Sequence, residues 1–112
     1  MTHEQLISEL TAAPGNERIV WAVLFEDVYE TAQGDGYYAY FATAFFTPED
    51  AVRFAANPSD YRFHIRRVRL SLYAGSLQCR PLDLQPFETI DADALIAALS
   101  HDSTPRLPKT QY

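Results

Sequence analysis

The sequence YYAYFATAFFTPEDAVRFAAN, residues 37–57, decides the predicted fold. Its first ten residues carry six aromatic rings separated by alanine and threonine, and aromatic rings suit the pleated, half-buried surface of a β-strand. Side chains alternate between the two faces of a strand, and neither face is polar here. We therefore expect an inner strand covered on both sides, or a strand with one face against a partner protein.

A helix is predicted directly after this strand. Thr47 is a favourable N-cap, because its hydroxyl oxygen can accept a hydrogen bond from a first-turn N–H. Pro48 then stands at the first helical position, where its missing N–H costs nothing. Glu49 and Asp50 place negative charge at the positive end of the helix dipole. Asn57-Pro58 ends the predicted helix, because the residue before a proline avoids the helical conformation.

Two further strands are predicted on either side of this unit. Residues 19–29 carry apolar side chains at alternating positions, and Gly34-Asp35-Gly36 is typical of a reversal. We therefore expect a hairpin between residues 19–29 and 37–46. The next strand is predicted over residues 61–73. Its apolar residues alternate, but they switch from one face of the strand to the other in the middle. A β-bulge near Arg66-Arg67 would bring both apolar sets to one face. Without a bulge, the strand has a mixed face.

The ends of the chain add two helices and a short strand to this prediction. Thr2 and Gln5 have the spacing of a capping box at the start of a helix over residues 2–12. Residues 77–84 predict a short edge strand, because prolines limit its pairing. Asp91 is the predicted cap of a helix over residues 91–99.

The predicted fold class is therefore α+β. We expect an antiparallel sheet of three to four strands with a ββαβ core, helices on one face, and N- and C-terminal helices. Residues 1–100 are predicted to form a single α+β domain, and residues 101–112 a polar C-terminal tail.

Composition fits one globular domain of 112 residues, with 47% hydrophobic and 13% aromatic residues. The sequence has no apolar run near the ~20 residues of a membrane span, and MTHEQLISEL lacks the pattern of a signal peptide. A single cysteine excludes an internal disulfide. We therefore expect a cytoplasmic protein with no membrane association.

Charge is segregated along the chain. The net charge is −6, yet residues 61–80 contain five arginines and no acid, whereas residues 1–60 contain ten acids and two bases. Repulsion from the acidic remainder opposes broad contact with phosphates, so this balance does not favour extensive nucleic-acid binding.

The sequence contains no recognisable catalytic or metal-binding motif. His3, His64 and His101 lack the spacing of metal ligands, and no Gly-rich phosphate loop is present. Cys79 is a lone thiol, and such cysteines are mostly buried and inert. We therefore predict no catalytic residue, no metal and no cofactor, and we regard an enzyme as the weaker of two hypotheses.

The predicted partner-binding residues crowd the expected hairpin. Acids and tyrosines alternate there, and tyrosine is enriched at protein interfaces because it joins an apolar ring to a polar tip. The partner-binding prediction covers Glu26, Asp27, Tyr29, Glu30, Asp35, Tyr37 and Tyr38.

Four arginines of the third strand have two alternative roles. They could contact an anion or an acidic partner, or they could pair inside the protein with Glu26, Asp27 or Glu30 on a neighbouring strand. We favour internal pairing. The four residues are Arg62, Arg66, Arg67 and Arg69.

The leading functional hypothesis is a small acidic interaction protein that binds and inhibits, or adapts, a larger protein with a basic patch. An immunity-type protein or a phage-encoded inhibitor of a host defence complex would have this size and charge.

The alternative starts from residues 37–55, YYAYFATAFFTPEDAVRFA, which resemble the ADP-ribosyltransferase stretch in which a Tyr-Phe-Ala strand precedes an alanine-rich helix. The resemblance covers under a fifth of the chain and implies a small transferase. That enzyme would need a pocket holding Tyr40, His64 or Cys79 near a carboxylate.

Overall fold

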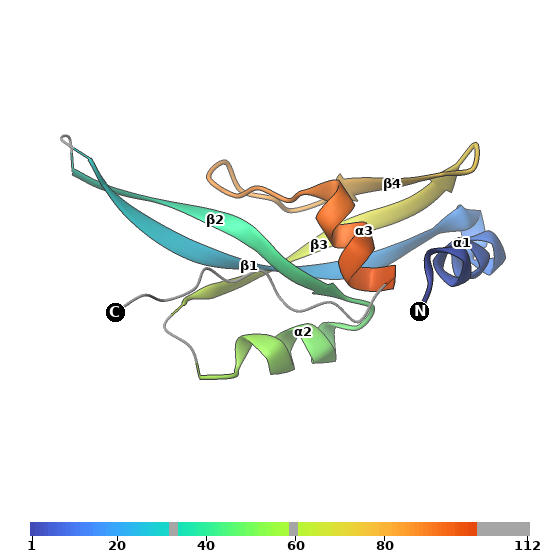
Figure 1. The fold of residues 1–112 in the computed structure, drawn as a ribbon, viewed down its shortest axis with the longest axis horizontal. Helices are drawn as coiled ribbons and strands as arrows, with labels where there is room; N and C mark the ends of the chain where they lie inside the picture. The colour runs from blue at the N-terminus through green and yellow to red at the C-terminus, as the bar shows by residue number, and fades with distance from the viewer. Residues whose placement is uncertain (32–33, 59–60, 101–112) are drawn as a thin grey trace.

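A computed structural model describes residues 1–31, 34–58 and 61–100, with the backbone alone at residues 28–31, 35 and 37. These residues form a four-stranded antiparallel sheet with three α-helices (Figure 1). The predicted α+β class with an antiparallel sheet is confirmed. In chain order the elements are α1 (His3–Ala12), the 3-10 turn η1 (Pro14–Asn16), β1 (Glu17–Thr31), β2 (Gly34–Phe45), α2 (Pro48–Ala55), β3 (Phe63–Tyr73), β4 (Ser76–Pro81) and α3 (Ala92–Ser100).

The strand order is β2-β1-β3-β4, so the aromatic strand β2 lies at an edge of the sheet. The expectation of an inner strand is wrong in this respect. Part of its outer edge is nevertheless occupied, because Ala39 donates its N–H to the carbonyl oxygen of Phe87 at 3.1 Å and accepts from Thr89 N–H at 3.0 Å. The chain after β4 therefore crosses to the opposite edge of the sheet and pairs with β2.

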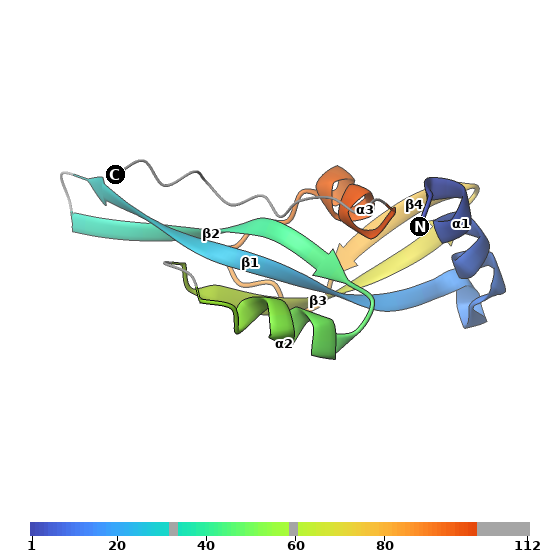
Figure 2. The ribbon, with the colours of Figure 1, turned by 60° about the horizontal axis from the view of Figure 1, so that its bottom comes forward.

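Helices cover both faces of the sheet, and not one face as predicted. On one face, Phe54 of α2 contacts Phe45 and Phe63, with ring centroids 5.8 and 5.4 Å apart. On the other face, α1 and α3 bury the main core. Figure 2 shows α3 above the strands and α2 below them. The main core contains Leu6, Leu10, Val20, Ala22, Leu24, Ala39, Phe41, Ala44, Val68, Leu70, Ala94, Leu95 and Leu99.

Because helices cover both faces of the sheet, the apolar residues of β3 can switch from one face of the strand to the other. The pairing of β3 with β1 runs without interruption from Glu17–Ser71 to Phe25–Phe63. The β1–β3 pair therefore has no bulge near Arg66-Arg67, and β3 has the mixed face that was the other alternative. Phe63 and Ile65 face the α2 side, whereas Val68 and Leu70 face the α1 and α3 side, because different helices cover the two ends. The register shift lies in the β1–β2 pair instead, between Val23 and Leu24.

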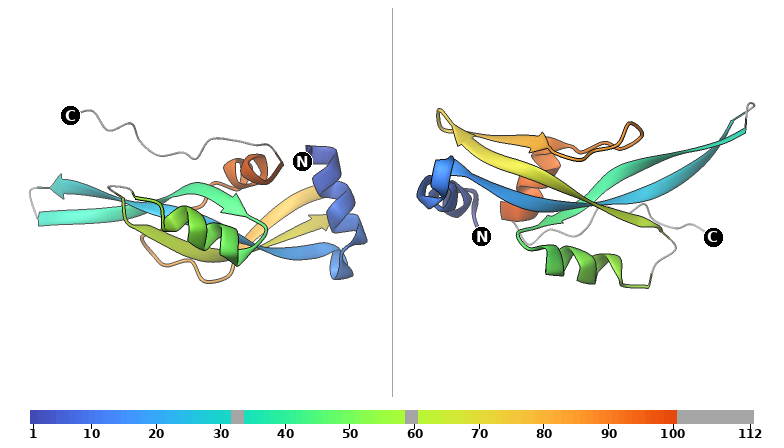
Figure 3. Two further views of the ribbon diagram at one scale, coloured as in Figure 1. Left: turned by 90° about the horizontal axis from the view of Figure 1, so that it is seen from below. Right: turned by 180° about the vertical axis from the view of Figure 1, so that it is seen from behind.

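The far end of the β1–β2 hairpin extends beyond the rest of the sheet (Figures 1 and 3). The pairing of β1 with β3 stops at Phe25–Phe63, whereas the pairing with β2 continues to Thr31–Gly34. We call residues 27–31 and 34–38 the arm. β1 and β2 pair as the expected antiparallel hairpin. Gly34, Asp35 and Gly36 are themselves paired in β2, and the connection, residues 32–33, lies outside the described residues.

The helix starts follow the capping signals in the sequence. Thr2 and Gln5 form a capping box at α1, and Thr47 Oγ1 accepts from Asp50 N–H at 3.3 Å at α2. Asp91 Oδ1 accepts from the N–H groups of Asp93 and Ala94 at 3.0 and 3.2 Å. In the described part of the chain, no helix is both long and apolar enough to cross a membrane.

Candidate functional site

The arm brings most of the predicted partner-binding residues onto one two-stranded ribbon. Its register places Asp27 opposite Tyr38, and Glu30 opposite Asp35. Asp27 is exposed, and the Tyr38 side chain is 45% exposed. Tyr29 and Tyr37 also lie on the arm, at positions where only the backbone is described.

Glu26 differs from the other predicted contact residues, because its side chain is largely buried. Its Oε1 lies 2.5 Å from His64 Nε2, and the two side chains are 17% and 19% exposed. The His64 ring also packs edge-on against Phe87 at a centroid distance of 6.5 Å. Glu26 therefore holds the base of the arm to β3 and offers little surface to a partner.

Beside this pair lies an ion pair that the sequence analysis missed. The Arg66 guanidinium donates two hydrogen bonds to the carboxylate of Glu88, at 2.6 and 2.7 Å. Glu88 also accepts from Gln85 N–H at 2.9 Å. The Glu88 side chain is fully buried, and that of Arg66 is 21% exposed. Arg66 is on the same, core-facing side of β3 as Val68 and Leu70. A cation on a core face needs a buried acid partner, so this position in the sequence could have indicated a buried ion pair.

The protonation of this pair follows from its contacts. Burial works to raise the pKa of Glu88, but the hydrogen bonds from Arg66 and Gln85 and the charges of Arg66 and His64 outweigh it, so the pKa is lowered. The hydrogen bond with Glu88 is the main reason that the pKa of Arg66 is raised. Both groups are therefore charged at neutral pH, and the pair fastens the residue 85–89 segment to β3.

Two more of the four predicted arginines also pair inside the protein. Arg67 lies 3.3 Å from Asp83, and Arg69 lies 3.7 Å from Glu17. The partners are therefore Asp83, Glu88 and Glu17, the first residue of β1, and not the predicted Glu26, Asp27 or Glu30. Arg62 is exposed, and none of the acids whose side chains the structure describes forms an ion pair with it.

A row of aromatic rings runs from the arm toward the centre of the sheet. The Tyr38 and Tyr40 rings lie 6.2 Å apart, Tyr40 and Phe25 lie 5.9 Å apart, and Phe25 and Tyr61 lie 5.3 Å apart. Tyr40 is 41% exposed. Beside it is a cavity of about 270 Å³ that is lined by Phe25, Tyr40, Phe41, Thr89, Asp91 and Ala94.

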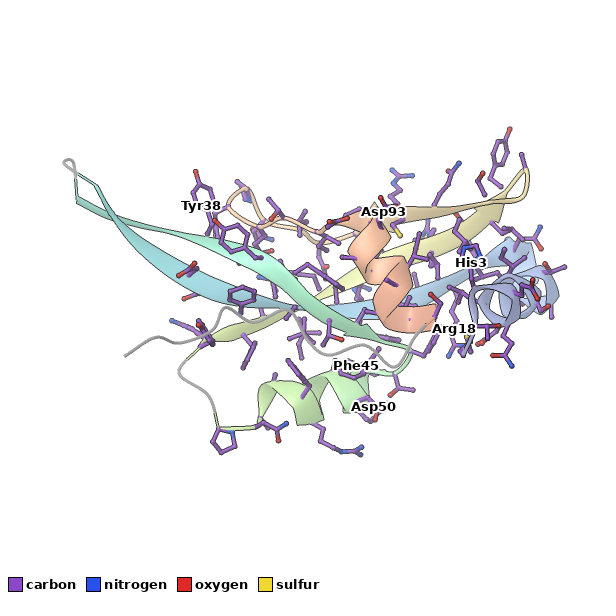
Figure 4. All side chains as sticks on the ribbon, viewed as in Figure 1. His3, Arg18, Tyr38, Phe45, Asp50 and Asp93 are labelled. Atoms are coloured by element: carbon purple, nitrogen blue, oxygen red, sulfur yellow. The ribbon has the colours of Figure 1, made fainter. Side chains whose placement is uncertain are left out.

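Cys79 lies on β4 and packs against the main core. Burial, and secondly the negative charge of Asp93 on the first turn of α3 (Figure 4), raises the pKa of its thiol to about 11. A thiol with this pKa is protonated at neutral pH and is a poor nucleophile. The described residues include no group of three or more His, Cys, Asp or Glu side chains suited to hold a metal ion.

Comparisons with known proteins assign this chain to no family, since no family model, curated protein or solved structure matches it.

Proposed function

We propose that this chain is a small protein-interaction module whose arm binds a basic patch on a larger protein, and thereby inhibits or adapts it. An immunity-type or anti-defence inhibitor acting in the cytoplasm belongs to this class. The observation that carries the proposal is the arm itself, a ribbon that extends beyond β3 and carries Asp27, Glu30 and Asp35 beside tyrosines.

The arm contributes little to the stability of the fold. An isolated two-stranded hairpin is marginally stable in water, and clustered acids repel one another. A basic partner would relieve this repulsion and accelerate association. The tyrosines would form the desolvated centre of the interface, and the acids its polar rim.

The test is a charge reversal of Asp27, Glu30 and Asp35 to lysine. Glu26 is left unchanged, because its contact with His64 at 2.5 Å makes it structural. All three positions lie on the arm, beyond the last β1–β3 pair, Phe25–Phe63, so thermal stability should change little. Partners are captured from the native host with the immobilised parent and variant, and are identified by quantitative mass spectrometry.

A Glu4/Glu49→Lys variant is the control, because it reverses two exposed acids on α1 and α2, away from the arm. We expect a protein that is retained by the parent and by the control but lost with the arm variant, with an association rate that falls steeply with salt. Equal retention by all three proteins refutes the proposal.

The alternative is a small transferase. Tyr40 and Asp91 line one cavity, which is the kind of juxtaposition that this hypothesis requires. His64 and Cys79 do not line that cavity, nor two others of about 250 and 320 Å³ among the described residues. The burial of His64 and the raised pKa of Cys79 give less support to an enzyme than the arm gives to an interaction module.

A further inference from the structure

We propose that β3 and β4 bind one phosphate monoester group at a second site, separate from the arm. Four polar side chains would hold it, namely Arg69 and Ser71 of β3 and Gln78 and Arg80 of β4. We call these four residues the arginine patch. The inference goes beyond the proposed function, because it concerns another surface and another class of ligand. The arm and the turn between β3 and β4 lie at opposite ends of the molecule (Figures 1 and 3).

The antiparallel register of β3 and β4 brings the four side chains of the patch together. Arg69 pairs with Arg80, and Ser71 pairs with Gln78. Residues directly opposite each other share one face of a sheet, with Cβ atoms about 4.5–5.5 Å apart, and residues two apart on a strand share a face as well. The patch is therefore a two-by-two grid in which two guanidinium groups stand beside a hydroxyl and an amide.

The protein itself neutralises the two arginines of the patch poorly. Arg80 is exposed, and none of the acids whose side chains the structure describes forms an ion pair with it. Arg69 Nε lies 3.7 Å from Glu17 Oε2, which is too long for a hydrogen bond, and this buried Nε has no hydrogen-bond partner. Like charges directly opposite each other in a sheet are unfavourable. An anion held between the two guanidinium groups would remove that repulsion.

The donors of the patch match a phosphate monoester. A guanidinium group presents its N–H donors in a planar fork that fits two phosphate oxygens, and a hydroxyl and an amide add further donors. A phosphate monoester carries a charge of about −1.5 to −2 at neutral pH, which balances two arginines, whereas a carboxylate or a phosphate diester carries a single charge. A free ester and a phosphorylated protein side chain share this chemistry, and the test separates them.

Glu17 competes with the ligand for Arg69. It pairs with Ser71 across β1 and β3, and its side chain is 46% exposed. A carboxylate at this position lowers the positive potential of the patch, so its removal should favour a bound anion. The site therefore predicts a gain of binding in one variant as well as losses in others.

The test uses the isolated protein and two small probes that differ by one methyl group and one charge. Backbone amide shifts are followed by NMR at about pH 7.5, above the second phosphate pKa of about 6, and at low ionic strength. Methyl phosphate is the dianion, and dimethyl phosphate is the monoanion. We expect saturable shifts at residues 69–71 and 78–80 with methyl phosphate, and clearly weaker binding of dimethyl phosphate.

A third probe, N-acetyl-phosphoserine amide, separates the two sources of the phosphate group. Binding that is tighter than that of methyl phosphate supports the site and assigns its ligand to a phosphorylated protein. Equal binding supports the site and assigns its ligand to a free phosphate ester.

Four variants assign the effect to its causes. Arg69→Gln and Arg80→Gln should each weaken the binding of methyl phosphate about 2- to 5-fold, the range of an exposed charge pair. Glu17→Gln should strengthen binding by a similar factor. Arg62→Gln is the matched control, because it removes one exposed arginine charge outside the patch; it should leave binding unchanged.

Four results would overturn the proposal: no saturable shifts with methyl phosphate, equal binding of the mono- and diester, unchanged binding in Arg80→Gln, or equal losses in Arg80→Gln and Arg62→Gln. The last result would show a general effect of net charge. None of these results affects the proposal for the arm, because the probes are anions and the acids of the arm are not part of the patch.

Discussion

Replacing Glu88 by glutamine should destabilise the protein by about 3 kcal/mol. The glutamine amide keeps one acceptor oxygen where the carboxylate has two, so one of the two Arg66 bonds at 2.6 and 2.7 Å is lost. A hydrogen bond to a charged group contributes about 1.5–3 kcal/mol, and breaking a buried ion pair costs about 3–5 kcal/mol. We expect the lower end, because 21% of the Arg66 side chain is exposed and water can solvate part of its charge.

The assay is urea unfolding followed by the fluorescence of Trp21, the one tryptophan of the chain. Glu17→Gln is the matched control: it makes the same chemical change in the Arg69–Glu17 pair, whose side chains are 40% and 46% exposed. That exposed pair should contribute about 0–1 kcal/mol. If the two variants lose the same small free energy of unfolding, the burial argument for Glu88 is refuted.

The pH dependence gives a second check on the same pair. The folded state lowers the pKa of Glu88, so its contribution is complete above the ordinary glutamate pKa of about 4.3 and is lost as pH falls through the folded value. The stability gap between the parent and Glu88→Gln should therefore be largest at neutral pH and shrink below about pH 4. A gap that stays constant from pH 7 to pH 3 contradicts this account.

Two further changes test the packing of α2 and the state of the thiol. Phe54→Ala should lower the free energy of unfolding in urea by about 2–3 kcal/mol, less than the loss of a fully buried ring, because Phe54 is half-buried against Phe45 and Phe63. Val52→Ala is the control and should change stability little, because Val52 is 58% exposed. Equal losses in the two variants would show that α2 packs differently. The pKa of Cys79 is raised to about 11, so only about a thousandth of the Cys79 thiol is thiolate at pH 8. A disulfide reagent should therefore label Cys79 far more slowly in the folded protein than in the urea-unfolded protein. Equal labelling rates would show an accessible thiol.

The sequence was sufficient for features that depend on neighbours a few residues apart. The caps at Thr2, Thr47 and Asp91 each use an N–H within three residues of the cap, so the residue types alone predicted them. Alternation likewise indicated where strands lie, because it depends only on the strand repeat. The α+β class and the grouping of acids on one hairpin followed from these local patterns.

The tertiary structure decided which residues meet across the sheet. His64 meets Glu26, 38 positions away, and Arg66 meets Glu88, 22 positions away. No local pattern selects such partners, because they depend on strand order and on where the chain crosses to the edge of β2. For the same reason the sequence could not show that β2 is an edge strand, that helices cover both faces, or that Asp91 adjoins Tyr40. Packing fixed these contacts, since both faces of β2 and β3 carry apolar side chains that had to be buried by different helices.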